Sequence, residues 1–329
     1  MAHTMPGTNV AGLDLPISSL VLGTMTFGDT VDAAGAATMV DAALDAGITV
    51  IDTANAYVGG VTEEIIAPLL AGRRDRVILA SKAGMPHPDA GDHPLLSAPA
   101  LRASIDGSLR RLDTDRIDLY YLHKPDRETP LAETLTTIAE LVRAGKVRAL
   151  GVSNFAAWQI SELNQVADAV GAPRPVVAQQ LYNLVARRIE EEYLEFATTT
   201  GLHTMVYNPL GGGLLTGKHS FTETPVEGRF GSSNLSAMYK ARYWDQQLFA
   251  AIAALGIIAA DADMPLVELS FRWLISQPAV GSILLGGSRP AQLEANIKAA
   301  AQGPLPEDIL AACDAVGRTL RGPMPAYNR

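Results

Sequence analysis

Short apolar runs alternate with helix-length amphipathic stretches along most of the chain. Eight of the runs have the length of a strand: residues 20–22, 48–51, 77–80, 117–122, 147–152, 176–180, 203–207 and 281–285. Most of them lack a regular alternation of polar and apolar residues. We therefore expect strands that are covered on both faces, as in a parallel sheet.

The stretches between these runs have the periodicity of helices. In one of them Leu101, Ile105, Leu109 and Leu112 fall on one helix face, behind Ser97 as a candidate N-cap. Similar stripes over 39–44 and 135–142 stop at Gly47 and Gly145, as helices often do at glycine. A strand followed by a helix, repeated about eight times, predicts an α/β protein with a closed (β/α)8 TIM barrel. An open doubly wound sheet is the alternative.

Two regions depart from this repeat. Residues 219–243 follow the seventh strand and are rich in Gly, Ser, Thr and Pro, so we expect a long loop there. The tail from Pro304 adds a helix and then Gly322-Pro323-Met324-Pro325, a C-terminal extension that we expect to fold back across the barrel. No repeat or linker divides the 329 residues, and the prediction is one domain over 1–329.

Composition and charge narrow the class of protein. With 48% hydrophobic residues, 19% charged residues and a net charge of −9, the chain can bury a large core and repels nucleic acids at long range. No Lys or Arg precedes Arg73, so the basic region of a secretory signal is missing. The longest apolar run, 249–260, is too short to cross a bilayer. We expect a cytoplasmic protein that binds neither membrane nor nucleic acid.

Several motifs fail on inspection. The segment 212–218 begins like a phosphate-binding P-loop, but His219 stands where Ser or Thr should bind magnesium. No dinucleotide fingerprint G-x-G-x-x-G follows an early strand. The single cysteine, Cys313, lies on an apolar helix face and is expected to be buried, while His87 and His93 are interpreted as solvated loop residues. No metal site is predicted.

Four polar side chains instead follow successive strands. Asp52 and Tyr57 come after the second strand, Lys82 after the third and His123 after the fourth. Each alone could be a cap, a loop residue, a solvated charge or a core histidine. The carboxyl ends of barrel strands converge on one face, where active sites of this fold are assembled. Together these residues form the candidate catalytic site.

The sequence resembles the aldo-keto reductases in motifs that extend from about residue 20 to the end of the chain. The matching segments are LGTMTFG at 22–28, IDTANAY at 51–57, SK at 81–82, LHKPD at 122–126, GVSNF at 151–155, QQLYN at 179–183, YNPLGGGLLTGK at 207–218 and ILLGGSRPAQLEAN at 283–296. Within the family it is most similar to the branch of aflatoxin-aldehyde and succinic-semialdehyde reductases. The features of that branch are GRF at 228–230, YKARYW at 239–244 and the terminal YNR at 327–329.

The resemblance implies that an aldehyde or ketone is reduced to an alcohol by hydride from NADPH. Tyr57 would donate the proton, and Lys82 would make it a stronger acid. A cation about 4 Å away stabilises a tyrosinate by at most about 4 kcal/mol at an effective dielectric of about 20. Asp52 would hold the Lys82 ammonium, and His123 would orient the substrate carbonyl.

Cofactor contacts also follow from the resemblance. Ser153, Asn154 and Gln179 match positions that bind the nicotinamide carboxamide, and Tyr207 matches the aromatic residue that stacks on the ring. Arg229 matches a clamping arginine, and the start of the last helix matches a site for the adenosine 2′-phosphate. The full set assigned to the cofactor is Gly23, Thr24, Met25, Asp52, Ser153, Asn154, Gln179, Tyr207, Asn208, Pro209, Leu210, Gly211, Gly213, Leu215, Gly217, Lys218, Arg229, Gly286, Ser288, Arg289, Gln292 and Asn296.

Substrate contacts are expected from Tyr57 and His123, together with Tyr239, Arg242 and the terminal Arg329. A guanidinium in the pocket would favour an aldehyde that carries a carboxylate. The expected substrate class also includes dicarbonyl aldehydes and ketones. Two alternatives stay open: a keto-sugar or quinone reductase of the same family, or a cofactor-binding regulatory subunit that resembles channel β subunits. The expected partner is a small carbonyl compound, and a homo-oligomer is left open.

Overall fold

The computed structural model describes residues 5–323. The described chain forms two compact units. The first, here called the barrel unit, comprises the residues up to Gln180 together with Glu190–Tyr207 and Ala279–Glu294. The second unit comprises Leu181–Ile189, Asn208–Pro278 and the residues from Ala295. Each is described by itself, and the prediction of a single domain stays a prediction.

The barrel unit is organised around eight parallel strands that close on themselves in the order β10-β3-β4-β5-β6-β7-β8-β9. Their bounds are β3 (Leu20–Gly23), β4 (Val50–Asp52), β5 (Ile78–Ala83), β6 (Ile117–Leu122), β7 (Val147–Ser153), β8 (Val177–Leu181), β9 (His203–Tyr207) and β10 (Ser282–Leu285). The last strand pairs with the first, with Ile283 opposite Leu20. All eight predicted strands and the (β/α)8 barrel are therefore confirmed.

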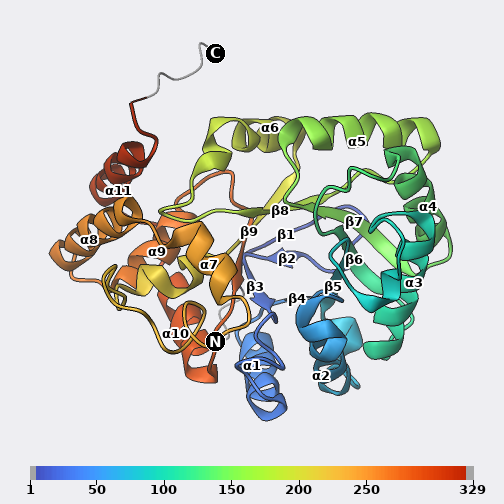
Figure 1. Ribbon diagram of the computed structural model, residues 1–329, viewed down its shortest axis with the longest axis horizontal. Coiled ribbons are helices and arrows are strands. Elements are labelled where there is room, and N and C mark those ends of the chain that lie inside the picture. Colours follow the sequence, from blue (N-terminus) through green and yellow to red (C-terminus); the bar gives the residue numbers. More distant parts are fainter. Residues whose placement is uncertain (1–4, 324–329) are drawn as a thin grey trace. The chain divides into compact units, whose positions relative to one another are not determined.

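Helices cover the outside of these strands (Figure 1). They are α1 (Ala33–Asp45), α2 (Val61–Leu69), α3 (Ala98–Arg111), α4 (Leu131–Arg143), α5 (Ala157–Val170) and α6 (Tyr193–Thr200). Asp32 is the N-cap of α1, and its carboxylate accepts from Gly35 N at 2.8 Å; beyond the C-terminus of the helix, Gly47 has φ +82°. Ser97 does occupy the N-cap position of α3, but its hydroxyl donates to Pro94 O instead of capping the helix.

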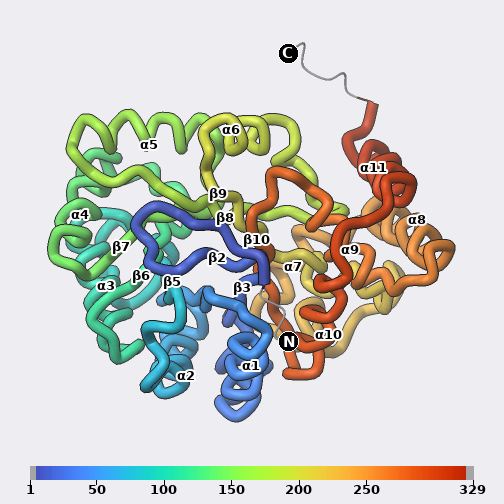
Figure 2. The backbone as a smooth tube through the Cα atoms, turned by 180° about the vertical axis from the view of Figure 1, so that it is seen from behind, coloured from blue at the N-terminus to red at the C-terminus, as the bar shows by residue number. Residues whose placement is uncertain are grey.

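The interior of the barrel is filled by side chains from several strands, including Val50, Ala80, Leu119 and Met205. Ile17 belongs to the same buried cluster and comes from a short antiparallel hairpin, β1 (Gly7–Thr8) with β2 (Ile17–Ser18). Figure 2 shows this hairpin lying across the end of the barrel. The hairpin closes the barrel opposite the carboxyl ends of the strands, which leaves those ends for the site.

The second unit is mostly helical. It contains α7 (Ser236–Tyr243), α8 (Gln246–Asp261), α9 (Leu266–Ile275) and α11 (Glu307–Leu320), and α8 packs against both α9 and α11. Cys313 is buried on α11, as predicted. The expectation of a loop over the whole of 219–243 is wrong at its end, because residues 236–243 form α7; Ala, Met, Lys and Arg there are good helix formers.

No single helix in residues 5–323 is long and apolar enough to cross a bilayer. Taken together, the consecutive helices α7 and α8 have enough length and apolar composition, but they are bent by 77° at their junction.

Candidate active site

A buried ion pair lies at the carboxyl ends of β4 and β5. Lys82 Nζ donates to the Asp52 carboxylate and, at 2.8 Å, to Thr53 O, and both charged side chains have no exposed surface. Gln179 Nε2 on β8 donates to the other Asp52 oxygen at 2.8 Å. Both oxygens of the Asp52 carboxylate therefore accept a hydrogen bond.

The environment keeps Lys82 protonated. Burial alone would lower the pKa of Lys82, but the Asp52 carboxylate and Tyr57 outweigh burial, so that the pKa lies above its usual value. Burial raises the pKa of Asp52, while Lys82 and Gln179 oppose that rise. At neutral pH the pair is an ammonium facing a carboxylate.

Tyr57 reaches the same ammonium from a tight turn, η1 (Tyr57–Gly60). Lys82 Nζ lies 3.3 Å from Tyr57 Oη and 5.1 Å from the ring centre. The next three residues, Val58, Gly59 and Gly60, have φ values of 49°, 63° and 98°. A β-branched residue such as Val58 is strained in this left-handed region, and such strain often marks functional sites.

His123 completes the cluster from the end of β6. Its backbone N donates to Ala83 O at 2.8 Å, and its ring meets Tyr57 edge to face with centroids 6.1 Å apart. Burial, and then the charges of Lys82 and Lys124, lower the pKa of His123 to about 3. The imidazole is therefore neutral at pH 7, and its Nδ1 has no hydrogen-bond partner within residues 5–323. The structure thus brings all four predicted catalytic residues together.

The predicted amide-binding residues form a connected chain beside His123. Ser153 Oγ donates to Gln179 O at 2.9 Å, and Asn154 Nδ2 donates to His123 O at 2.9 Å. Tyr207 Oη donates to Asn154 Oδ1 at 2.7 Å. The bond from Gln179 to Asp52 could not be predicted from the sequence. Its only signal is the pair of polar residues, Gln179 and Gln180, in a strand that is otherwise apolar.

Three more predicted cofactor residues lie at the end of β3 and just after it: Gly23 is the last residue of the strand, and Thr24 and Met25 follow it. Thr24 donates to Asp52 O from both its backbone N and its hydroxyl, at 3.0 and 2.9 Å. A Cβ on Gly23 would lie 3.0 Å from Leu284 Cδ2 and 3.1 Å from Leu285 O, so Gly23 packs tightly against β10. These contacts hold the end of β3 and the residues after it against β4, which carries Asp52, and against β10.

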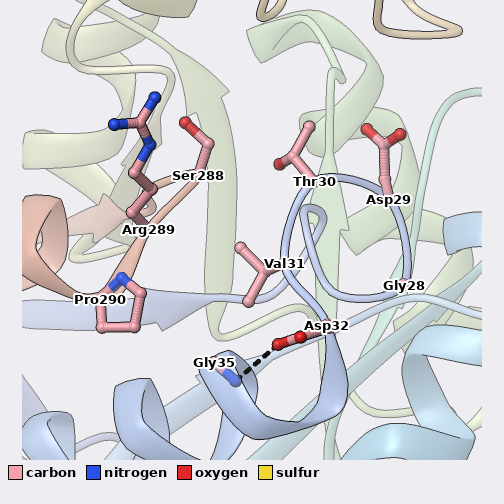
Figure 3. A pocket seen from close by; sticks show the side chains of 9 residues that line it. All are labelled: Gly28, Asp29, Thr30, Val31, Asp32, Gly35, Ser288, Arg289 and Pro290. Atoms are coloured by element: carbon pink, nitrogen blue, oxygen red, sulfur yellow. Dashed lines mark hydrogen bonds between the residues drawn. The ribbon is translucent and has the colours of Figure 1, made fainter.

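A pocket of about 530 Å3 opens between the loop after β3 and the start of α10 (Pro290–Ala300). Figure 3 shows Ser288 and Arg289 on one side of the pocket and Asp29 and Thr30 on the other. Ser288 donates from its N and its Oγ to Gln292 Oε1, at 2.9 and 3.0 Å. An exposed guanidinium next to the first turn of a helix is a suitable environment for an anion.

In the second unit, the predicted pyrophosphate segment forms the turn η5 (Gly211–Thr216). Gly211, Gly212 and Gly213 all have left-handed φ values, and Asn208 Oδ1 accepts from Gly212 N at 2.7 Å. A Cβ on Gly212 would lie 2.5 Å from Tyr239 Cδ1. The remaining predicted residues Pro209, Leu210, Leu215, Gly217 and Lys218 lie in and around the same turn.

Arg229 and Arg242 lie over one aromatic ring of the second unit. Their guanidinium carbons are 5.4 and 6.0 Å from the centroid of Tyr239. Tyr239 is buried, and Arg229 Nη1 is buried without a hydrogen-bond partner within residues 5–323. Of the other predicted residues, Gly286 follows β10, Asn296 lies buried on α10, and Arg329 lies outside the described residues.

The sequence is similar to those of known proteins over most of its length. The sequence model of the Aldo/keto reductase family matches residues 19–318. Aflatoxin B1 aldehyde reductase member 2 of Rattus norvegicus is 34% identical over 324 residues, covering 94% of this chain and 87% of that protein. Aldo-keto reductase family 7 member A3 of Homo sapiens is 36% identical and covers 94% and 96%. A probable voltage-gated potassium channel subunit beta of Oryza sativa is 32% identical and covers 88% and 87%.

Proposed function

Because this chain belongs to the aldo/keto reductase family, whose members reduce carbonyl compounds to alcohols with a nicotinamide cofactor, we propose that it is an NADPH-dependent aldehyde reductase with Tyr57 as proton donor. The observation that carries the proposal is the distance of 3.3 Å between Lys82 Nζ and Tyr57 Oη, with Asp52 holding the ammonium. A bound reduced nicotinamide supplies the hydride to the carbonyl carbon.

The proton then comes from the protein. As negative charge develops on the carbonyl oxygen, Tyr57 Oη donates its proton, and the adjacent Lys82 ammonium stabilises the tyrosinate that is left. Asp52 and Thr53 O fix the ammonium, so little reorganisation is needed at this step. The neutral His123 ring has one N–H, which donates to the same carbonyl oxygen and orients it.

The described residues fit an anionic dinucleotide. Arg289 and Ser288 line a pocket that can take the 2′-phosphate, and Gln292 holds the Ser288 hydroxyl in place. In the second unit, Arg229 Nη1 has no hydrogen-bond partner within residues 5–323 and is suited to a phosphate oxygen. Ser153, Asn154 and Gln179 present amide and hydroxyl groups for a carboxamide. The 2′-phosphate site is the reason to favour NADPH over NADH.

Steady-state assays test the proposal directly. We expect purified protein to oxidise NADPH with small aldehydes, without any added protein partner, and Tyr57→Phe to lose nearly all of this activity. If Arg242 and Arg329 meet the substrate, an aldehyde carrying a carboxylate will have a lower KM than its neutral analogue. Preference for a keto-sugar or a quinone would change the substrate class. Cofactor binding without turnover would favour a regulatory subunit.

The choice of cofactor rests on Arg289. We expect Arg289→Ala to lower the ratio of kcat/KM for NADPH over NADH by about 10-fold to 100-fold, the value of one or two charge-assisted hydrogen bonds. Arg318→Ala is the matched control, since Arg318 is an exposed arginine on α11 outside every predicted contact. An unchanged ratio in Arg289→Ala would move the 2′-phosphate to another part of the chain.

A further inference from the structure

A second cluster of buried charges lies on the outer face of β5, away from the Lys82 ammonium. Ser81 precedes Lys82, and because side chains alternate along a strand it points to the opposite face. Its Oγ donates at 2.6 Å to Oε1 of Glu63, a residue of α2 with no exposed surface. The strand that carries Lys82 is therefore tied to α2 by a carboxylate.

Arg111 continues the cluster from the last turn of α3. Its Nε donates to Glu63 Oε2 at 2.8 Å, and its Nη2 donates to Asp89 Oδ2 at 2.9 Å. Asp89 also lies 3.1 Å from His87 Nδ1, and the His87 side chain is only 4% exposed. The expectation of a solvated loop histidine is wrong for His87, because the loop folds onto Asp89 and buries the ring.

The same cluster touches the turn that presents Tyr57. Gly60 ends that turn, and a Cβ there would lie 2.8 Å from Arg111 Cδ, so the turn packs directly against the Arg111 side chain. The α2 helix that carries Glu63 begins at the next residue, Val61. One carboxylate and one guanidinium thus hold both the Tyr57 turn and the Lys82 strand.

This turn needs such a hold because its backbone is strained. Val58 has φ 49° and ψ 38°, a conformation that costs a β-branched residue energy and persists only when its surroundings enforce it. The cluster has the required rigidity. Glu63 uses both carboxylate oxygens in charge-assisted bonds, and the neighbouring carboxylates outweigh burial to raise the pKa of Arg111, which stays charged.

We propose that Glu63, bridged by Arg111, is a positioning residue that fixes the distance between Lys82 Nζ and Tyr57 Oη and thereby sets the acid strength of the proton donor. The inference rests on the proposed function, since it concerns the same proton. Glu63 acts through the turn and the strand, because its two carboxylate oxygens accept from Ser81 and from Arg111.

Glu63→Gln is the informative variant. The amide keeps the volume and can still accept from Ser81, but it puts an N–H2 group or a weaker neutral acceptor against the Arg111 guanidinium. We expect kcat to fall about 10-fold to 100-fold, the effect of a displacement of roughly 1 Å at the reacting atoms. We expect the KM for the aldehyde and the Kd for NADPH to stay within about 2-fold of wild type.

The pH profile separates positioning from simple destabilisation. If the ammonium moves about 1 Å further from Tyr57 Oη, the tyrosinate is less stabilised and the pKa of Tyr57 rises. The alkaline limb of the pH profile of kcat/KM then moves to higher pH by about one unit. Tyr120, a buried phenol close enough to feel the charges of Glu63 and Asp89, does not titrate in this range, since burial and these two carboxylates raise its pKa well above the usual value. His87 faces Asp89 in both proteins, and wild type and variant are compared over the same range.

Glu140→Gln is the matched control. Glu140 makes the same kind of pair with Arg102 of α3, at 2.6 Å, but on the surface of the protein. We expect its kcat and alkaline limb to equal those of wild type. Ser81→Ala is the milder companion variant: it removes the hydroxyl that ties the strand to Glu63, and serves if Glu63→Gln does not fold.

An NMR titration of the protein without cofactor gives a readout independent of turnover. With isotope-labelled tyrosine, the signal that disappears in Tyr57→Phe belongs to Tyr57, and we expect it to titrate at higher pH in Glu63→Gln or Ser81→Ala than in wild type. A folded Glu63→Gln with wild-type titration and alkaline limb would overturn the positioning role. An inactive wild type, or an active Tyr57→Phe, would overturn the proposed function instead, and the titration would still decide the role of Glu63.

Discussion

The two faces of β5 carry buried charges of different kinds. On the inner face, the Lys82 ammonium is held by Asp52 and also contacts the phenol of Tyr57, which is partly exposed. On the outer face, both oxygens of Glu63 are taken up by Ser81 and Arg111 inside the protein. A buried charge that contacts an accessible hydroxyl, as Lys82 contacts Tyr57, can take part in proton transfer. A buried charge whose hydrogen bonds all go to other protein groups, like Glu63, holds its neighbours in place.

Lys82→Met removes the ammonium from the inner face of β5 and has the largest expected effect on kcat. Without the ammonium, the tyrosinate loses its stabilising charge, and we expect kcat to fall about 10²-fold to 10⁴-fold, the usual contribution of a positioned acid. The thioether side chain fills most of the space of the lysine stem. Turnover of simple aldehydes by Lys82→Met at a near-native rate would contradict the role of the ammonium.

The same variant also separates activity from stability. Lys82→Met leaves the Asp52 carboxylate buried and unpaired, and we expect a loss of about 3–5 kcal/mol in the free energy of unfolding. Adding Asp52→Leu removes that charge, so the double variant should regain most or all of the stability while staying inactive. Denaturant unfolding of wild type, the single variant and the double variant measures this. A double variant no more stable than Lys82→Met would show that the pair itself stabilises the fold.

The inner face could be predicted from the sequence, whereas the outer face could not. Asp52 ends β4, Lys82 lies near the end of β5 and His123 directly follows β6, and a barrel brings successive strand ends together. Glu63 and Arg111 lie on two different helices, 48 residues apart, and no local pattern relates their side chains. Their pairing depends on how α2 and α3 pack against β5.

The fold divides in a similar way. Mainly apolar runs of three to six residues are a strong signal when they recur between helical stretches, and all eight barrel strands follow from them. The strands of the β1–β2 hairpin have two residues each, too few to show any periodicity, so sequence analysis missed them. The Gly-rich and Pro-rich composition of residues 219–235 hid the helix α7 that follows in 236–243.

His203 on β9 is a third buried titratable group, and it differs from the groups on both faces of β5 because burial alone shifts its pKa. Its Nε2 lies 2.9 Å from Ser282 Oγ, and burial lowers the pKa of His203 to about 4. The unfolded chain, with an ordinary histidine pKa near 6.5, binds more protons between pH 6.5 and 4, so this contribution to stability is complete above pH 6.5 and is lost as the pH falls toward 4. The loss in the free energy of unfolding is on the order of 3 kcal/mol.

Denaturant unfolding at several pH values measures this contribution. Between pH 6.5 and pH 4, the free energy of unfolding of His203→Gln should fall less than that of wild type. Equal losses would mean that His203 is solvated in the folded protein.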